Sequence, residues 1–256
     1  MKILADISTR KNDIIISLCF LLAAGLLVWS AYAAWMHFRT TPPHVDHARY
    51  PVLGIDVSAH NGMMNLNAAA SDGIEFIWIK ASEGETFRDK NFRLNHQKAG
   101  VAGIKRGAYH FFRFDKDGVS QAINLLEAID NRKLEIGIAI DIESFGNSEE
   151  IPTETVKERL AAMVDYLNLC GFSPTLYATK KDYYEYLADS FPGSRLWICS
   201  FSDDPISADW KFWQFSHQGS VSGISGKVDL NVFGGSRKEW LDFLNAQQYQ
   251  GAKSVK

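Results

Sequence analysis

Ile136-Gly-Ile-Ala-Ile-Asp-Ile-Glu143 is the stretch of sequence that decides the fold. Side chains along a β-strand alternate between two faces, so the four isoleucines share one surface, and the glycine, the alanine and the two acids share the other. One face can pack on helices, whereas the other is narrow and then acidic at its carboxyl end. This pattern is typical of a barrel strand that ends at an open site. The alternative is an edge strand whose last polar residues are solvated.

Apolar runs of similar length recur along the chain and indicate about eight strands, the number that closes a small barrel. The candidates are residues 52–57, 76–81, 104–112, 136–143, 175–178, 196–201, 212–215 and 228–233. Apolar residues recur at helical spacing between Pro152 and Gly171, and further helices are predicted at 91–99, 120–129 and 180–188. The last three strands are joined by short loops without room for helices. The sequence therefore predicts an α/β fold that becomes mostly β towards its end.

A hydrophobic segment at residues 14–36 contains no charged residue. About 23 residues can span a bilayer with some tilt. Basic residues are concentrated before the segment, in residues 1–13, which favours a cytoplasmic N-terminus and a single-pass anchor with the following domain exported. Ala31-Tyr-Ala33 resembles a signal-peptidase site, so secretion after signal cleavage is the alternative. Aromatic residues near the outer end favour the anchor.

The remaining chain divides into a polar linker at residues 37–50, one domain at 51–246 and a polar tail at 247–256. About 200 residues suffice for one core. A formal net charge of −3 and the lack of a Lys/Arg run argue against nucleic-acid binding. Cys170 and Cys199 are the candidates for a disulfide within the domain, but we expect packed thiols, and no Cys/His spacing indicates a metal site. The oligomeric state stays open.

Acids also end other predicted strands. Gly54-Ile-Asp-Val-Ser58 places Asp56 near the end of the first strand, and Val228-Asp-Leu-Asn231 places Asp229 in the last. A single aspartate at a strand end is usually a turn or cap residue. Four acids at the ends of barrel strands instead indicate one shared acidic site.

Seven motifs lie in a particular order between residues 52 and 245: Gly54-Ile-Asp-Val-Ser58, Lys80-Ala-Ser-Glu-Gly84, Gly107-Ala-Tyr-His-Phe-Phe112, Ile138-Ala-Ile-Asp-Ile-Glu143, Leu196-Trp-Ile198, Trp213-Gln-Phe-Ser216 and Gly223-Ile-Ser-Gly-Lys-Val-Asp-Leu-Asn231. In order and spacing they resemble the glycoside hydrolase family 25 muramidases, the Chalaropsis-type lysozymes. The resemblance implies a flattened TIM-like barrel with five β/α units and three further strands. That architecture agrees with the strand count made from the residues.

The resemblance also implies an activity and the residues that perform it. The activity is cleavage of the β-1,4 bond between N-acetylmuramic acid and N-acetylglucosamine in peptidoglycan glycan strands, with net retention and without a metal or organic cofactor. Glu143 matches the proton donor of the family and Asp141 its paired carboxylate. Further matches in the groove are the acids Asp56 and Asp229, the tyrosine Tyr109, and Trp213 and Gln214 of a Trp-Gln motif. The tryptophan of that motif is expected to border the sugar site, although a packed core residue fits the sequence equally well.

The chemistry of two neighbouring acids agrees with these roles. Glycosidic cleavage needs a protonated acid at the leaving oxygen and a carboxylate that stabilises positive charge at the sugar carbon. Two acids crowded at one strand end disfavour joint ionisation, so one keeps its proton near neutral pH. We expect that acid to be Glu143, with Asp141 stabilising the charge or orienting the 2-acetamido group of the sugar.

Three other functions remain open from the sequence. A chitinase-like glycosidase also ends a barrel strand with alternating acids, although Gly137 and Ala139 stand where a longer acidic series would be. A membrane-tethered, inactive wall-binding module would keep the groove, and a scaffold for protein partners would show an exposed apolar patch. Asn61 and Asn65-Leu66 depart from the family pattern at the expected substrate rim. The intact pair of acids after Ile140 favours an enzyme.

Overall fold

The computed structural model describes residues 18, 20–33, 45–148, 150–201, 205–206 and 208–251. The chain divides into two units, Met1–Pro42 and Pro43–Lys256. In the first unit, residues 20–33 are helical, and the predicted N-terminus at 1–13 and the ends of the predicted span at 14–36 lie outside the described residues. Within the part of the chain that is described, no helix combines the length and the apolar character that crossing a membrane requires.

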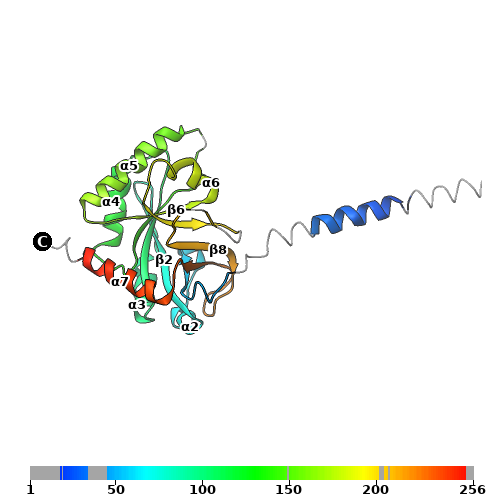
Figure 1. Ribbon diagram of the computed structural model, residues 1–256, viewed down its shortest axis with the longest axis horizontal. Coiled ribbons are helices and arrows are strands. Elements are labelled where there is room, and N and C mark those ends of the chain that lie inside the picture. Colours follow the sequence, from blue (N-terminus) through cyan, green and yellow to red (C-terminus); the bar gives the residue numbers. More distant parts are fainter. Residues whose placement is uncertain are drawn as a thin grey trace, which may run out of the picture. The chain divides into compact units, whose positions relative to one another are not determined.

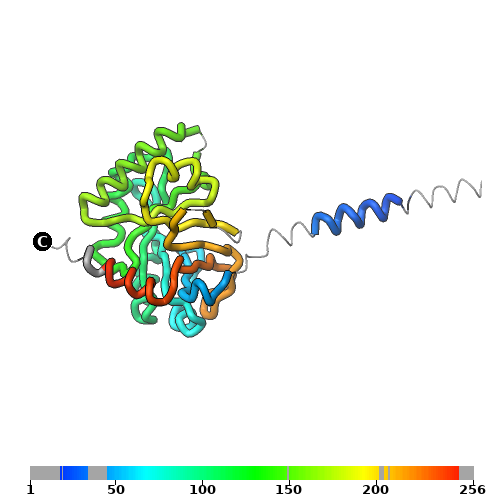
Figure 2. The backbone as a smooth tube through the Cα atoms, viewed as in Figure 1, coloured from blue at the N-terminus to red at the C-terminus, as the bar shows by residue number. Residues whose placement is uncertain are grey.

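In the described residues of the second unit, nine strands form one sheet, and all of them except the two-residue β3 (Phe87–Arg88) close into a barrel (Figures 1 and 2). Neighbours from β1 to β8 pair in parallel, and β9 is antiparallel to both β8 and β1, which closes the ring. This confirms the predicted α/β barrel and its strand number. The barrel strands are β1 (Leu53–Val57), β2 (Ile74–Glu83), β4 (Lys105–Phe111), β5 (Gly137–Asp141), β6 (Thr175–Thr179), β7 (Arg195–Cys199), β8 (Phe212–Gly219) and β9 (Val228–Phe233).

Helical segments follow the first five barrel strands, and β7 and β8 are followed by loops, as the sequence predicts. The helical segments are η1 (Ala59–Asn61) and α2 (Leu66–Ser71) after β1, α3 (Phe92–Val101) after β2 and β3, α4 (Gly118–Ile129) after β4, α5 (Thr153–Leu169) after β5, and α6 (Lys180–Asp182) with the π-helical turn η2 (Tyr183–Leu187) after β6. The short elements η1, α2 and β3 were not predicted, because so few residues carry no clear period.

A last helix, α7 (Arg237–Gly251), follows β9 and corrects the predicted domain end. We expected a polar tail from residue 247, but the helix runs through to Gly251. No glycine or proline interrupts it before that residue. Trp240 and Leu244 of this helix pack into the same apolar cluster as the side chains inside the barrel, so α7 is anchored by its first half.

The barrel interior is filled by aromatic side chains. Phe76 and Trp78 of β2 lie there with Trp197 of β7, and the two indole rings stack with centroids 5.2 Å apart. Small residues on neighbouring strands make the room. A Cβ on Gly107 would lie 2.3 Å from the Trp78 ring, and one on Gly54 would lie 2.4 Å from the Phe76 ring. Small and large residues are therefore matched across strands, a correspondence that no single strand reveals.

The strand predicted at 136–143 is shorter in the structure, Gly137–Asp141, and the predicted face is correct for three of its four isoleucines. Ile138, Ile140 and Ile142 lie in the cluster between barrel and helices, as predicted. Ile136 does not, because it packs into the interior cluster with Ala139. Gly137 has φ 85°, which interrupts the alternation of faces between these two residues.

The predicted linker at 37–50 is too long at its C-terminal end. Val45 is 4% exposed and packs on Trp213 of β8. The Tyr50 ring lies 5.4 Å from the ring of Trp210. Residues 45–50 therefore belong to the barrel unit, while 37–44 lie outside the described residues. Two apolar side chains are enough to hold this short segment against the barrel, but they are too few to show a helical or strand periodicity in the sequence.

Candidate active site

The four acids singled out from the sequence meet at one end of the barrel. Asp56 lies near the carboxyl end of β1 and Asp141 ends β5, with Glu143 two residues further on. Because β9 is antiparallel to β1, Asp229 near its start pairs directly with Asp56. The charge of Asp229 raises the pKa of Asp56, and that of Glu143 raises the pKa of Asp141. The structure thus brings all four into one electrostatic cluster.

Asp56 is held by two amides. Gln214 and Asn231 each donate a hydrogen bond of 2.8 Å to Oδ2 of Asp56. The Tyr177 hydroxyl donates to the amide oxygen of Gln214 at 2.9 Å, and the Trp197 N–H donates to that of Asn231 at 2.8 Å. These outer contacts fix the orientation of both amides, so their NH₂ groups point at the carboxyl.

This arrangement gives Gln214 a different role from the predicted one. Gln214 is 6% exposed and both ends of its amide are occupied, so it positions Asp56 and offers little surface to a ligand. Tyr177 was missed by the sequence analysis, and Trp197 was quoted in a motif without a role, because their function depends on which distant strands become neighbours. Asn231 carried a signal, since it shares a face with Asp229 two residues away.

Burial is the main cause of the raised pKa of both aspartates in this pair. Desolvation raises the pKa of Asp56 well above its ordinary value, the Asp229 charge adds to that, and the amide donors act in the opposite direction. Desolvation also raises the pKa of Asp229, to about 6. Two carboxyls this close disfavour joint ionisation. The pair therefore retains a proton under conditions in which exposed aspartates are ionised.

Asp141 and Glu143 form the second pair. Burial and then the Glu143 charge raise the pKa of Asp141 well above its ordinary value. Burial, followed by the charges of Asp182 and Asp56, raises the pKa of Glu143 to about 7, and Lys80 opposes the shift. Oδ1 of Asp141 is buried and has no hydrogen-bond partner in the described part of the chain. The pair thus combines a carboxyl whose pKa lies near 7 with a neighbouring carboxyl oxygen, Oδ1 of Asp141, that is free to accept a hydrogen bond.

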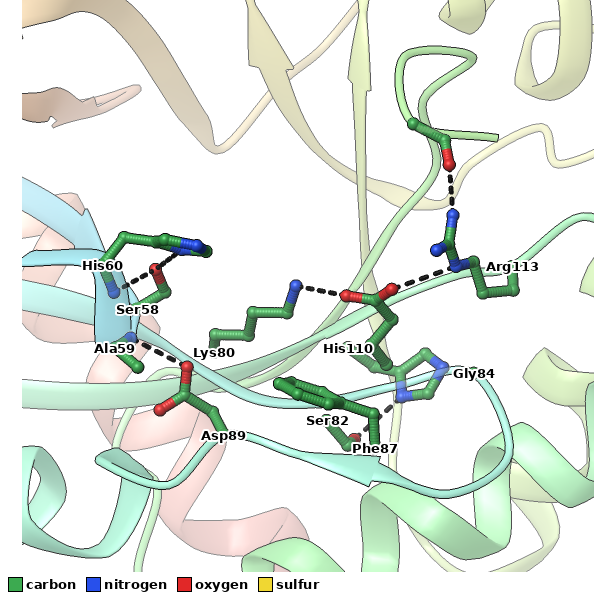
Figure 3. A network of polar contacts seen from close by, with 12 residues as sticks. Ser58, Ala59, His60, Lys80, Ser82, Gly84, Phe87, Asp89, His110 and Arg113 are labelled. Atoms are coloured by element: carbon green, nitrogen blue, oxygen red, sulfur yellow. Dashed lines mark hydrogen bonds and ion pairs between the residues drawn. The ribbon is translucent and has the colours of Figure 1, made fainter. Parts of the chain in front are cut away.

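A charged cluster holds the loop that carries Glu143 (Figure 3). Glu83 at the end of β2 contacts Nζ of Lys80 at 2.6 Å and Nε of Arg113 at 3.0 Å, and Figure 3 shows the two cationic side chains converging on one carboxylate. Arg113 also donates to the carbonyl of Gly146 in the loop after β5. Asn147 donates at 3.0 Å to the carbonyl of Glu143 itself. The Lys80-Ala-Ser-Glu-Gly84 motif thus supplies Lys80, a cation that faces the acids. Through Glu83 and Arg113 the motif is also connected to the loop that carries Glu143.

The two aromatic residues predicted to bind substrate separate in the structure. Tyr109 is partly exposed, and burial followed by the charges of Asp56 and Asp141 raises its pKa well above the ordinary value, so it borders the acids. Trp213 is 2% exposed on the opposite face of β8 from Gln214, and its Nε1 donates to the carbonyl of Ser200 at 2.7 Å. The prediction that Trp213 borders the sugar site is wrong, because it is a packed core residue.

The thiols take no part in a cluster with the acids that could bind a metal. Cys170 and Cys199 are both free, as expected. Burial raises the pKa of the Cys199 thiol to about 12, so it stays protonated at neutral pH. Across the residues that the structure describes, no group of three His, Cys, Asp or Glu side chains is arranged to hold a metal ion.

A buried histidine stabilises the same end of the barrel. His110 is fully buried, with Nδ1 2.8 Å from the Ser82 hydroxyl and Nε2 3.1 Å from Oε1 of Gln121. Gln121 Oε1 also accepts from the backbone N–H of Arg113 at 2.7 Å. Because that oxygen only accepts, Nε2 of the histidine carries the proton and Nδ1 accepts from the serine.

This histidine makes the stability depend on pH in a defined direction. Burial lowers the pKa of His110 to about 4. Its stabilising contribution is therefore complete above pH 6.5 and is lost as the pH falls towards 4, by about 3 kcal/mol at most. We expect His110→Asn to reduce the free energy of unfolding more at pH 7 than at pH 4. Denaturant unfolding of both chains at the two values checks this, and an equal loss at both would contradict it.

Buried acids at the carboxyl ends of barrel strands, with one carboxyl titrating near pH 7, are the arrangement that glycosidases use. Residues 55–224 match the sequence profile of the glycosyl hydrolases family 25. The chain belongs to this family.

Relatives and solved structures agree with the family. The chain is 32% identical to an autolytic lysozyme of Clostridium acetobutylicum over 70% of its own length and 55% of the relative, and 31% identical to lysozyme M1 of Streptomyces globisporus over 76% and 71%. It thus spans about half of the clostridial protein. Among solved structures, a family 25 glycosyl hydrolase from Bacillus anthracis superposes with a TM-score of 0.70 at 32% identity, covering 78% of this chain and 96% of that one. A bacterial lysozyme from Streptomyces coelicolor gives 0.67 at 31% identity, with 77% and 98% covered.

Proposed function

We propose that this protein is a peptidoglycan hydrolase, an N-acetylmuramidase that cleaves the β-1,4 bond between N-acetylmuramic acid and N-acetylglucosamine with net retention. The observation that carries the proposal is the pair formed by Glu143, whose pKa is raised to about 7, and the buried Asp141 with an unoccupied oxygen. The lysozyme names of two relatives support the choice of substrate.

In the proposed reaction, Glu143 donates its proton to the glycosidic oxygen as the bond from that oxygen to the anomeric carbon breaks. The carbonyl oxygen of the sugar's own 2-acetamido group attacks the anomeric carbon from the opposite face and forms a cyclic oxazolinium intermediate. Oδ1 of Asp141 accepts a hydrogen bond from the acetamido N–H, and the carboxylate stabilises the positive charge of the intermediate. Water then adds to the anomeric carbon as the bond from that carbon to the acetamido oxygen breaks and the acetamido group re-forms. The water gives a proton to the Glu143 carboxylate, which restores the starting state with retained configuration.

Asp56 and Asp229 take a supporting role in this proposal. Their shared proton limits the negative charge beside the reacting carbon, and the two amides hold Asp56 in one place. Tyr109, which borders the acids, is placed to contact the sugar. Preorganised polar groups of this kind stabilise charge that develops in the transition state.

The pH dependence of the rate follows from the proton that Glu143 must carry. Because its pKa is about 7 in the free protein, the reactive fraction falls about tenfold per pH unit above neutrality. We expect kcat/KM on solubilised peptidoglycan to be highest at mildly acidic pH and to decline above about pH 7. A profile that stays flat up to pH 9 would count against Glu143 as the proton donor.

Parallel digestion of purified peptidoglycan and chitin oligomers separates the proposal from its alternatives. A muramidase releases new reducing ends from peptidoglycan and leaves chitin oligomers intact. Faster cleavage of chitin oligomers would indicate a chitinase-like glycosidase, and binding to peptidoglycan without release of reducing ends would indicate an inactive wall-binding module.

We further propose that residues 14–36 anchor the chain by a single span, with the barrel on the extracytoplasmic side. The uncharged run of about 23 residues and the basic residues before it support this topology. Extraction of membranes with alkaline carbonate tests it, because an anchored chain stays in the pellet. A soluble product whose N-terminus follows Ala33 would show that the segment is a cleaved signal peptide.

A further inference from the structure

A buried acid contacts the residue that follows the proposed proton donor, and it was not singled out from the sequence. Asp182, the last residue of α6, is 3% exposed. Its Oδ1 accepts a hydrogen bond of 2.5 Å from the hydroxyl of Ser144, the residue after Glu143. Its Oδ2 accepts one of 2.6 Å from the hydroxyl of Thr179 at the end of β6. Asp182 is thus connected through Ser144 to the backbone of Glu143.

The charge on Asp182 is held but not neutralised by these contacts. Each oxygen of this carboxyl contacts a hydroxyl group, and an ionised carboxylate can accept hydrogen bonds at both oxygens. Hydroxyl groups are neutral donors, so the negative charge persists beside the loop of Glu143. The position of the carboxylate is also firm, because its own backbone N–H donates to Thr179 Oγ1 at 3.1 Å.

We propose that Asp182 is a positioning residue that keeps Glu143 in its protonated, proton-donating form and fixes the start of the loop that carries it. The inference rests on the proposed role of Glu143 as the general acid. A buried negative charge nearby disfavours a second one, so it favours the neutral form of Glu143. The hydrogen bond to Ser144 keeps the Asp182 carboxylate at a fixed position relative to the backbone that carries Glu143.

Other charged and titratable groups also act on Glu143, and they define what Asp182 adds. The charges of Asp56 of β1 and Lys80 of β2 act on its pKa. The charge of Glu143 in turn raises the pKa of four further groups around it: Asp141 of β5, Tyr177 of β6, Cys199 of β7 and Asp229 of β9. Of the charges that raise the pKa of Glu143, that of Asp182 has the largest effect after burial. Lys80 is the cation that opposes it, and Lys80 is already paired with Glu83.

The test compares the full-length chain with Asp182→Asn, which removes the charge but keeps a group of the same shape beside both hydroxyls. The first measurement is the titration midpoint of Glu143, followed by ¹³C NMR of glutamate-labelled protein and assigned by the signal lost in Glu143→Gln. We expect the midpoint to fall by about one pH unit. This measurement needs no substrate, so it is independent of the proposed activity.

Matched variants separate charge from structure. Glu185→Gln removes a charge from η2 on a side chain that is 35% exposed and lies 4.0 Å from Lys181, and it should leave the midpoint unchanged. Asp182→Glu keeps the charge and should keep most of the high midpoint. Asp182→Ser provides a second neutral variant if the asparagine does not fold. An unchanged Glu143 midpoint in both neutral variants would overturn the proposal.

The second measurement is the pH profile of kcat/KM on peptidoglycan. If Asp182 acts through Glu143, the decline of the rate at alkaline pH shifts down by the same unit in Asp182→Asn, and the rate at pH 5 changes much less. A uniform loss at every pH with no shift would show a merely structural role. A midpoint that falls while the alkaline decline stays in place would contradict Glu143 as the acid, and with it the catalytic role of Asp182.

Discussion

Replacing Glu143 with glutamine is expected to reduce kcat on peptidoglycan by about a thousandfold. General acid catalysis contributes factors of roughly 10² to 10⁴, and an amide cannot donate the proton that the leaving oxygen needs. The variant should fold, because burial disfavours the charged form of the parent side chain and the amide is neutral. The release of reducing ends from purified peptidoglycan, measured at saturating substrate, gives kcat for both chains.

A matched control shows that the loss is specific to this carboxyl. Glu154 lies in the first turn of α5, pairs with Lys157 at 2.9 Å, and its side chain is 79% exposed. Glu154→Gln should leave kcat within about twofold, because exposed pairs contribute little to stability and this one is outside the acidic cluster. A Glu143→Gln chain that keeps more than about a tenth of the parental rate would show that another group supplies the proton.

Replacing Asp141 with asparagine should have the next largest effect, a loss of about a hundredfold to a thousandfold in kcat. Loss of one preorganised group that stabilises developing charge has this size. The asparagine still fits the site but brings no negative charge to the oxazolinium intermediate. Its effect should appear in kcat more than in KM, since the charge develops only during the reaction.

The same residue distinguishes the two chemical routes to retention. In the proposed route the acetamido group of the substrate is the nucleophile, so no bond forms between sugar and protein. Mass spectrometry of the protein quenched during turnover should therefore show the unmodified chain. A glycosyl adduct on a peptide containing Asp141 would contradict the role given to that residue and would make it the nucleophile.

The sequence was sufficient to predict the barrel and the acids for a simple reason. Parallel strands of a closed sheet place their carboxyl ends together, so polar residues at strand ends meet without further information. Asp56, Asp141 and Glu143 follow this rule. Asp229 was counted with them as an acid of the last predicted strand, but it joins them from the start of an antiparallel strand, where it pairs with Asp56.

Contacts between distant segments could not be predicted in the same way. The amides around Asp56 require β9 to lie beside β1 and β8 to lie beside β9, an order that only the closed ring reveals. Alternation separates Trp213 from Gln214, but it does not say which of the two faces inward. Asp182 reaches the loop of Glu143 from beyond the next strand, through a hydrogen bond between residues 38 positions apart.

The acidic site also has a consequence for stability. Desolvation raises the pKa of Asp56, Asp141, Glu143 and Asp229, so each carboxyl favours folding least at a pH where it must ionise inside the protein. His110 acts in the opposite direction, because its neutral form is the one that fits. The acids of the site therefore stabilise the fold most at lower pH, whereas His110 beside them stabilises it most at higher pH.

The identity of the new reducing end tests the central claim most directly. Purified peptidoglycan is digested with the full-length chain and with Glu143→Gln, the products are reduced with borohydride, and their terminal sugars are identified by mass spectrometry. The account predicts reduced N-acetylmuramic acid at the new ends with the parent chain and none with the variant. New ends that carry N-acetylglucosamine, or the same products from both chains, would contradict it.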